Sequence, residues 1–201
     1  MSQIQENSRV QSPVSHPHLQ RLLTENKMVA EASATLVSQF SPAQLNWKPD
    51  AKIWSMLENF DHLNIIMGMY FPAMEKHLNM LKSRDRKSTD AFKPTWFGKM
   101  FVGIVLPEST RKMKTVGVFV PQQGTKDPEE VMQQFEKNIA QLDQLIVESD
   151  GYALNYKKFA SPASALVRLT LGEALWLQVA HNHRHLLQAK RLQELSDFPK
   201  V

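Results

Sequence analysis

The chain has 201 residues, of which 42% are hydrophobic, and this length suits one domain with its own core. It contains no cysteine, which excludes disulfides, thiolate zinc sites and a cysteine nucleophile. Its 24 basic and 20 acidic residues give a net charge of +4, but the basic residues are interspersed among acids, so we expect no nucleic-acid binding. No apolar run approaches the ~20 residues that cross a bilayer, and the first residues lack the features of a signal peptide. We therefore expect a cytoplasmic protein with no membrane contact.

The N-terminal part of the chain divides into a tail and a helix. Residues 1–15 are rich in Ser, Gln and Asn, and we expect a flexible tail there, followed by one domain over residues 16–201. Apolar residues recur at helical spacing over residues 17–40, which predicts a first helix. Ser41-Pro42 ends it, because the residue before a proline disfavours the helical region. Residues 43–52 are predicted to form a packed loop.

A second helix is predicted to begin after Ser55, because Ser55 and Glu58 have the spacing of a capping box. Its apolar pattern continues to about Leu81. Residues 83–125 are rich in proline and glycine and form a long connection, with a short helix near residues 97–105 and an extended piece at 116–120. A connection of this length in a compact domain is often functional.

Two further helices are predicted in the C-terminal half. The third begins at Asp127-Pro128, where Asp127 caps and proline occupies the first helical position, and it ends near residue 150. Ser161-Pro162 is predicted to start a short helical turn. Thr170 and Glu173 form another capping box, and the last helix continues to about residue 195. The order predicts an all-α four-helix bundle with a long crossover between helices two and three.

Three histidines are predicted to lie on inward faces of these helices. His181 and His185 are four residues apart, so both imidazoles lie on one face of the last helix. His62 lies among apolar residues of the second helix. A single buried histidine is usually structural, but three that face one core each need partners. We therefore predict that His62, His181 and His185 bind a divalent metal ion, with zinc, nickel, iron and manganese all open.

The other histidines are not expected to join this site. A metalloprotease motif needs glutamate after its first histidine, and the chain has Asn182 there. His183 is predicted to lie on the surface, and His77 lies too far along the second helix. His16 and His18 lie in or next to the tail.

Two polar residues have alternative roles. Glu58 lies one turn before His62 and could orient its ring, but we favour the capping role. Gln188 follows His185 by three residues and could bind a ligand, or it could simply be polar near the helix end.

The motifs together resemble the DinB-like superfamily over about residues 17–195. The resemblance rests on three segments: Trp54-Ser55 with Glu58 and His62-Leu63, Ser161-Pro162 with Leu171-Gly172-Glu173, and His181 with His185 and Gln188. It implies a four-helix bundle in which the three histidines bind a divalent metal. Members include bacterial thiol transferases that use bacillithiol or mycothiol, and a mycothiol-dependent maleylpyruvate isomerase.

Three function classes follow from such a site. A metal with three histidine ligands keeps an open position, where it would lower the pKa of a bound water toward ~7 or deprotonate a bound thiol. By the resemblance, we expect a metal-dependent thiol S-transferase that takes a low-molecular-weight thiol and an electrophilic substrate. The alternatives are a hydrolase that uses metal-bound hydroxide, and a non-catalytic, metal-stabilised binding or stress-response bundle. A homodimer through helix faces is also open.

Overall fold

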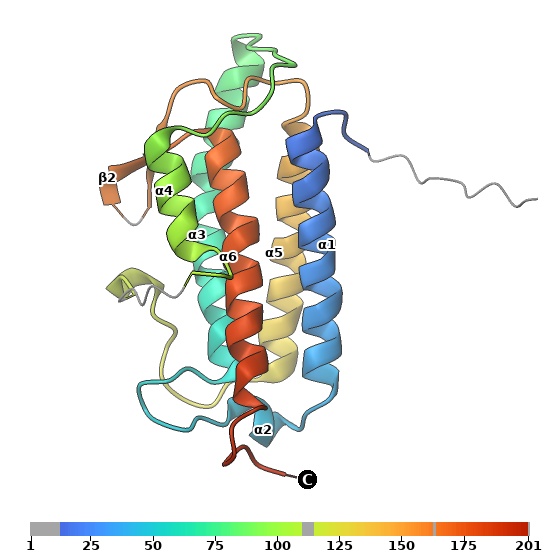
Figure 1. The fold of residues 1–201 in the computed structure, drawn as a ribbon, viewed down its shortest axis with the longest axis vertical. Helices are drawn as coiled ribbons and strands as arrows, with labels where there is room; N and C mark the ends of the chain where they lie inside the picture. The colour runs from blue at the N-terminus through green and yellow to red at the C-terminus, as the bar shows by residue number, and fades with distance from the viewer. Residues whose placement is uncertain (1–12, 110–114, 163, 201) are drawn as a thin grey trace, which may run out of the picture.

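Four long helices lie side by side in the computed structural model, which describes residues 13–109, 115–162 and 164–200 (Figure 1). Helices α3 and α6 pack against each other, α3 also packs on α5, and α1 packs on both α5 and α6. Their bounds are α1 Pro17–Ser38, α3 Met56–Ser83, α5 Pro128–Glu148 and α6 Leu171–Leu192. The mostly helical structure fits the all-α class that was predicted from the sequence.

The starts of the helices that carry the three histidines are fixed by the predicted capping boxes. Ser55 accepts a hydrogen bond from the Glu58 backbone N–H, and the Glu58 side chain accepts one from the Ser55 N–H. Thr170 and Glu173 do the same at α6. Each box satisfies two N–H groups that a helix start leaves without an intrahelical partner. Helix α3 continues through Pro72 without ending.

Three short elements connect the long helices: α2 Pro42–Asn46, α4 Trp96–Val105 and the 3₁₀ helix η1 Gly117–Phe119. The prediction of a short helix near residues 97–105 is confirmed by α4. The loop predicted over residues 43–52 is wrong at its start, because Ser41 and Gln44 form a capping box for α2. The extended piece predicted at 116–120 is wrong at its centre, because η1 occupies residues 117–119, whereas Val116 and Val120 on either side of it are extended.

A small antiparallel sheet precedes α6, where we predicted a helical turn at Ser161-Pro162. Its strands are β1 Phe159–Ser161 and β2 Ser164–Leu169. Phe159 pairs with Leu169, and the buried Leu169 follows the exposed Arg168. Successive side chains of a β-strand point to opposite faces, and the change in burial from Arg168 to Leu169 fits that alternation. The segment therefore forms a hairpin instead of a helical turn.

Apolar side chains from all four long helices form the core, in which the rings of Phe60 and Phe135 lie 5.1 Å apart. None of the described helices has the length and apolarity to span a membrane. Residues 1–12 of the predicted tail lie outside the described residues. Val14 is buried, and the next residue, Ser15, donates through its backbone N–H and its hydroxyl to Asp150.

Candidate metal centre

The contact between α3 and α6 brings His62, His181 and His185 together. One ring nitrogen from each histidine lies within 4.8 Å of the other two. His62 and His185 are buried and His181 is half-buried, so the cluster lies inside the protein with His181 as its most accessible member. The same three side chains were singled out from helical spacing.

The ring of His62 is oriented by a backbone carbonyl. Its Nδ1 lies 2.7 Å from the carbonyl oxygen of Phe119, which belongs to η1. Because a carbonyl oxygen only accepts, Nδ1 carries the proton and donates it. The Nε2 lone pair of His62 is therefore free for the centre of the cluster, and metal-binding histidines are commonly oriented in this way.

A side-chain amide orients His185. The Nδ1 atom of His185 lies 2.8 Å from Oδ1 of Asn59, and the Nδ2 atom of Asn59 donates to the Ser55 carbonyl over 2.8 Å. The second bond fixes which end of the amide faces the histidine. His185 thus donates from Nδ1 and keeps its lone pair on Nε2.

The remaining contact joins His181 to His185, with 3.0 Å between their Nε2 atoms. Two facing imidazole nitrogens need either one shared proton or one cation between their lone pairs. No other hydrogen bond to the His181 ring is found in the described ranges. Three nitrogen donors, two of them with fixed tautomers, fit a divalent metal that prefers imidazole, such as zinc, nickel or iron.

Burial keeps the three imidazoles neutral. Loss of solvation lowers the pKa of His62 to about 4 and that of His181 to about 3. The same cause, with smaller effects from the neighbouring imidazoles, holds the pKa of His185 well below its ordinary value. Since only the neutral ring offers a lone pair, the cluster is in its metal-binding form at neutral pH.

The ring of Trp54 packs against the histidine cluster. The ring of Trp54 lies 4.6 Å from the ring of His62 and 5.9 Å from that of His185, between centroids. Trp54 was noted only as part of a motif. Its position excludes water from one side of the site and so strengthens electrostatic interactions there.

Glu58 does not orient His62. Both of its oxygens are used: one accepts from the Ser55 N–H, and Lys48 contacts both at 2.8–2.9 Å. The capping role that we favoured is therefore confirmed. Gln188 is half-buried, and its side chain makes no hydrogen bond within the part of the chain that the structure describes.

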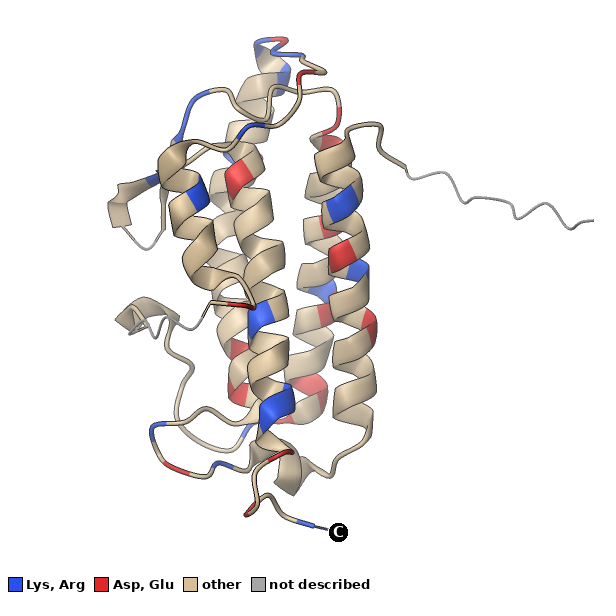
Figure 2. Cartoon of the chain, viewed as in Figure 1, with Lys and Arg blue, Asp and Glu red and all other residues tan. Residues whose placement is uncertain are grey.

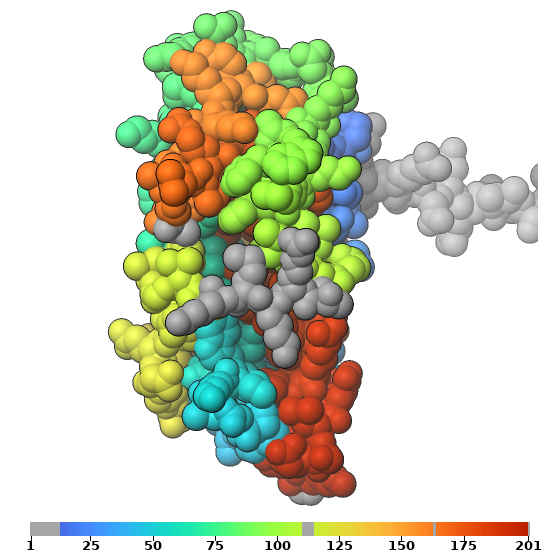
Figure 3. Space-filling model, turned by 60° about the vertical axis from the view of Figure 1, so that its left-hand side comes forward, coloured from blue at the N-terminus to red at the C-terminus, as the bar shows by residue number. Residues whose placement is uncertain are grey.

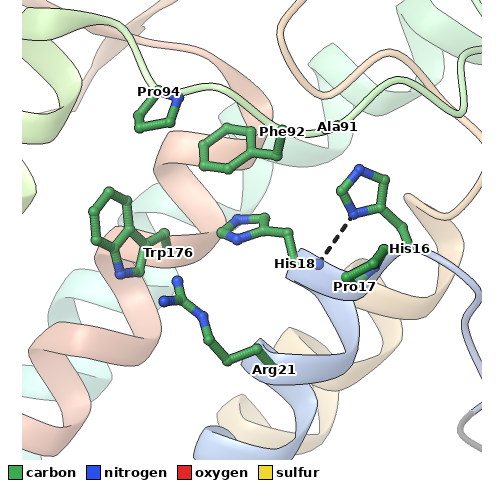
Figure 4. Close-up of a pocket in the computed structure, with 8 residues that line it drawn as sticks. All are labelled: His16, Pro17, His18, Arg21, Ala91, Phe92, Pro94 and Trp176. Atoms are coloured by element: carbon green, nitrogen blue, oxygen red, sulfur yellow. Dashed lines mark hydrogen bonds between the residues drawn. The ribbon is translucent and has the colours of Figure 1, made fainter.

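The other histidines lie apart from the cluster. His183 is exposed as expected, and His77 bonds through Nε2 to the Tyr156 carbonyl. His16 and His18 line a separate cavity of about 430 Å³, where the His18 ring stacks on Phe92 at 4.0 Å (Figure 4).

One turn before His181, α6 carries a buried amide that sequence reasoning missed. Gln178 is 1% exposed, and neither the nitrogen nor the oxygen of its side chain has a hydrogen-bond partner among the described residues. The Oδ1 atom of the buried Asn182 also has none in the described part of the chain. Unsatisfied buried polar atoms cost free energy, so these amides lower the stability of the helix contact that carries the site.

The comparisons with known proteins give one positive finding. The sequence matches the family model of the DinB superfamily over residues 27–189, which is most of the chain. No curated protein and no solved structure shows a significant match.

Proposed function

Because this chain belongs to the DinB superfamily, we propose that His62, His181 and His185 bind one divalent metal ion that activates a low-molecular-weight thiol for transfer. The four long helices would serve as a four-helix bundle that holds the site. The observation that carries the proposal is the shared orientation of His62 and His185. Both donate from Nδ1 to protein oxygens, which leaves both Nε2 lone pairs for one ion.

The chemistry that the metal supplies when bound is stabilisation of a thiolate at neutral pH. The chain has no cysteine, so the sulfur must come from a small molecule. In the transfer, the sulfur forms a bond to the electrophilic carbon, and the bond to the leaving group breaks with its electron pair. The thiol proton passes to solvent. The work of the protein is to keep the three imidazoles neutral and oriented and, through Trp54, to exclude water.

A turnover assay tests this reaction. The metal-loaded protein is mixed with an aryl halide and each of several low-molecular-weight thiols, and released halide is measured. We expect turnover that requires both thiol and metal and that is lost in His62→Ala. The exposed His183→Ala variant is the matched control and should keep wild-type turnover.

The other two function classes give different results in the same assay. Cleavage of an ester without added thiol would show that the protein is a hydrolase and not a thiol transferase. If no substrate turns over and metal removal only lowers the melting temperature, the ion has a structural role alone.

A further inference from the structure

Helix α4 and the β1–β2 hairpin lie side by side on one side of the long helices (Figures 1 and 3). Both elements project large apolar side chains into solvent. Leu166 on β2 is 90% exposed, Trp96 at the start of α4 is 80% exposed, and Met100 one turn later is 40% exposed. We call these three residues the apolar face. Single exposed apolar residues are ordinary, but a group of large ones on adjoining elements marks an interaction surface.

The two segments that carry the apolar face contain basic residues but no acidic ones. Residues 91–105 and 152–169, which form α4, the hairpin and their approaches, contain no aspartate or glutamate. Much of the blue on this side of Figure 2 belongs to these segments. Their five cations form no ion pair with any described residue: Lys93, Lys99, Lys157, Lys158 and Arg168.

We propose that the apolar face binds peripherally to the surface of an anionic membrane. Trp96 and Leu166 enter the headgroup region, while the five cations contact lipid phosphates. An indole suits this position because it combines an apolar body with a polar N–H group. Each lysine near an anionic bilayer contributes electrostatic attraction that decreases as salt is raised. Burial of the apolar side chains contributes a binding free energy that salt does not screen.

The charges favour a lipid surface over a second copy of the chain. A two-fold dimer through this face would set five unpaired cations of one copy against the same five of the other. Like charges across an interface oppose association, whereas anionic phosphates neutralise them. The sequence led us to expect no membrane contact because it contains no spanning segment, but peripheral binding does not need one.

Vesicle flotation tests the proposal with the full-length, metal-loaded protein. The vesicles contain phosphatidylcholine alone, or phosphatidylcholine mixed with phosphatidylglycerol. We expect binding to the anionic vesicles, at least about tenfold weaker binding to the neutral ones, and weakening as salt is raised. A double variant, Trp96→Ala with Leu166→Ser, should lose about tenfold or more in binding, and so should Lys93→Glu with Lys99→Glu.

Matched controls come from α1, which lies away from the apolar face in Figure 1. Met28 is 61% exposed there, and Lys27 is exposed although it forms an ion pair with Glu31, so Met28→Ser and Lys27→Glu remove an exposed apolar group and an exposed cation elsewhere. Both should bind vesicles like the wild type. Metal content is measured in every variant, and unchanged content shows that the fold and the metal centre are intact. A failure of lipid binding is thereby distinguished from a failure of the proposed function.

Three results would overturn the membrane proposal. The first is no binding to anionic vesicles. The second is equal binding by the wild type and both double variants. The third is a concentration-dependent dimer that the Trp96→Ala and Leu166→Ser changes abolish, which would assign this face to a second copy.

Discussion

His185 donates its Nδ1 proton to the Oδ1 atom of Asn59 over 2.8 Å, and the two residues belong to different helices. Asn59 cannot turn its amide around without losing its own bond to the Ser55 carbonyl. The start of α3 therefore determines the tautomer of a histidine on α6. Its Nε2 lone pair is the one that faces His181.

Removing this acceptor should weaken metal binding. In Asn59→Ala, His185 loses its fixed tautomer, and we expect metal affinity to decrease about 10- to 100-fold. Competition with a chromogenic chelator measures it. The matched control is Asn64→Ala on the same helix, where a buried amide donates to the Val131 carbonyl. That variant should lose stability but not metal affinity, and an equal loss of affinity in both would contradict a specific role for Asn59.

Acid should destabilise the metal-free protein. Burial lowers the pKa values of His18 and His62 to about 4, whereas histidine in an unfolded chain titrates near 6.5. Between these values the unfolded chain binds more protons than the folded protein, so the free energy of unfolding decreases as pH falls from about 6.5 to about 4. The stabilisation is fully present above pH 6.5. Urea unfolding over this range measures the slope.

The His18→Gln variant separates one contribution to that slope. It removes a buried histidine that is not part of the metal centre, so we expect a shallower decline than in the wild type. His183→Gln changes an exposed histidine and should leave the slope as it is. A free energy of unfolding that stays constant over this range would contradict the lowered pKa values of the buried histidines.

Position 98 should not tolerate a side chain. A Cβ atom added to Gly98 would lie only 2.1 Å from Oε1 of Glu173, and the same oxygen accepts from the Thr95 N–H at the start of α4. Gly98→Ala must displace Glu173 from this bond, and we expect a loss of about 1–3 kcal/mol in the free energy of unfolding. A Cβ at Gly103, on the same helix, meets nothing within 4 Å.

Gly103→Ala is therefore the control, and helix propensity should leave it neutral or stabilised by up to ~1 kcal/mol. Chemical denaturation of the two variants under one set of conditions makes the comparison. Equal stabilities would mean that Glu173 does not hold α4 in place.

The buried amide of Gln178 should lower stability. Gln178→Leu replaces two unsatisfied polar atoms by an apolar side chain of similar size, so we expect the free energy of unfolding to increase by about 1–3 kcal/mol. Gln44→Leu is the counterpart, because Gln44 is also buried but its amide is bonded to Ser41 and to the Pro199 carbonyl. It should lose stability. A loss in Gln178→Leu would show that this amide has a bound partner, such as an ordered water.

The helices and the three histidines could be predicted because both depend on local spacing. Capping boxes mark the starts of α3 and α6, and a separation of four residues places His181 and His185 on one helix face. Asn59 had a detectable signal as well, since it lies three residues before His62 on the same side of α3.

The rest depends on contacts between distant segments. The atom that orients His62 is the backbone carbonyl of Phe119, which has no signature in the sequence and lies in a connection without periodicity. The β1–β2 hairpin was missed because Ser161-Pro162 resembles a helix start, while the pairing of Phe159 with Leu169 needs both strands in place. Exposure of Trp96 likewise depends on how α4 packs.

The most direct test of the account is the metal content of the protein. Wild type, His181→Ala and the surface control His183→Ala are purified identically, and bound divalent metal is measured by elemental analysis with circular dichroism to verify folding. The account predicts about one ion per chain in the wild type and in His183→Ala, and a large loss in His181→Ala. Equal stoichiometric metal in all three folded proteins would contradict the metal centre formed by His62, His181 and His185.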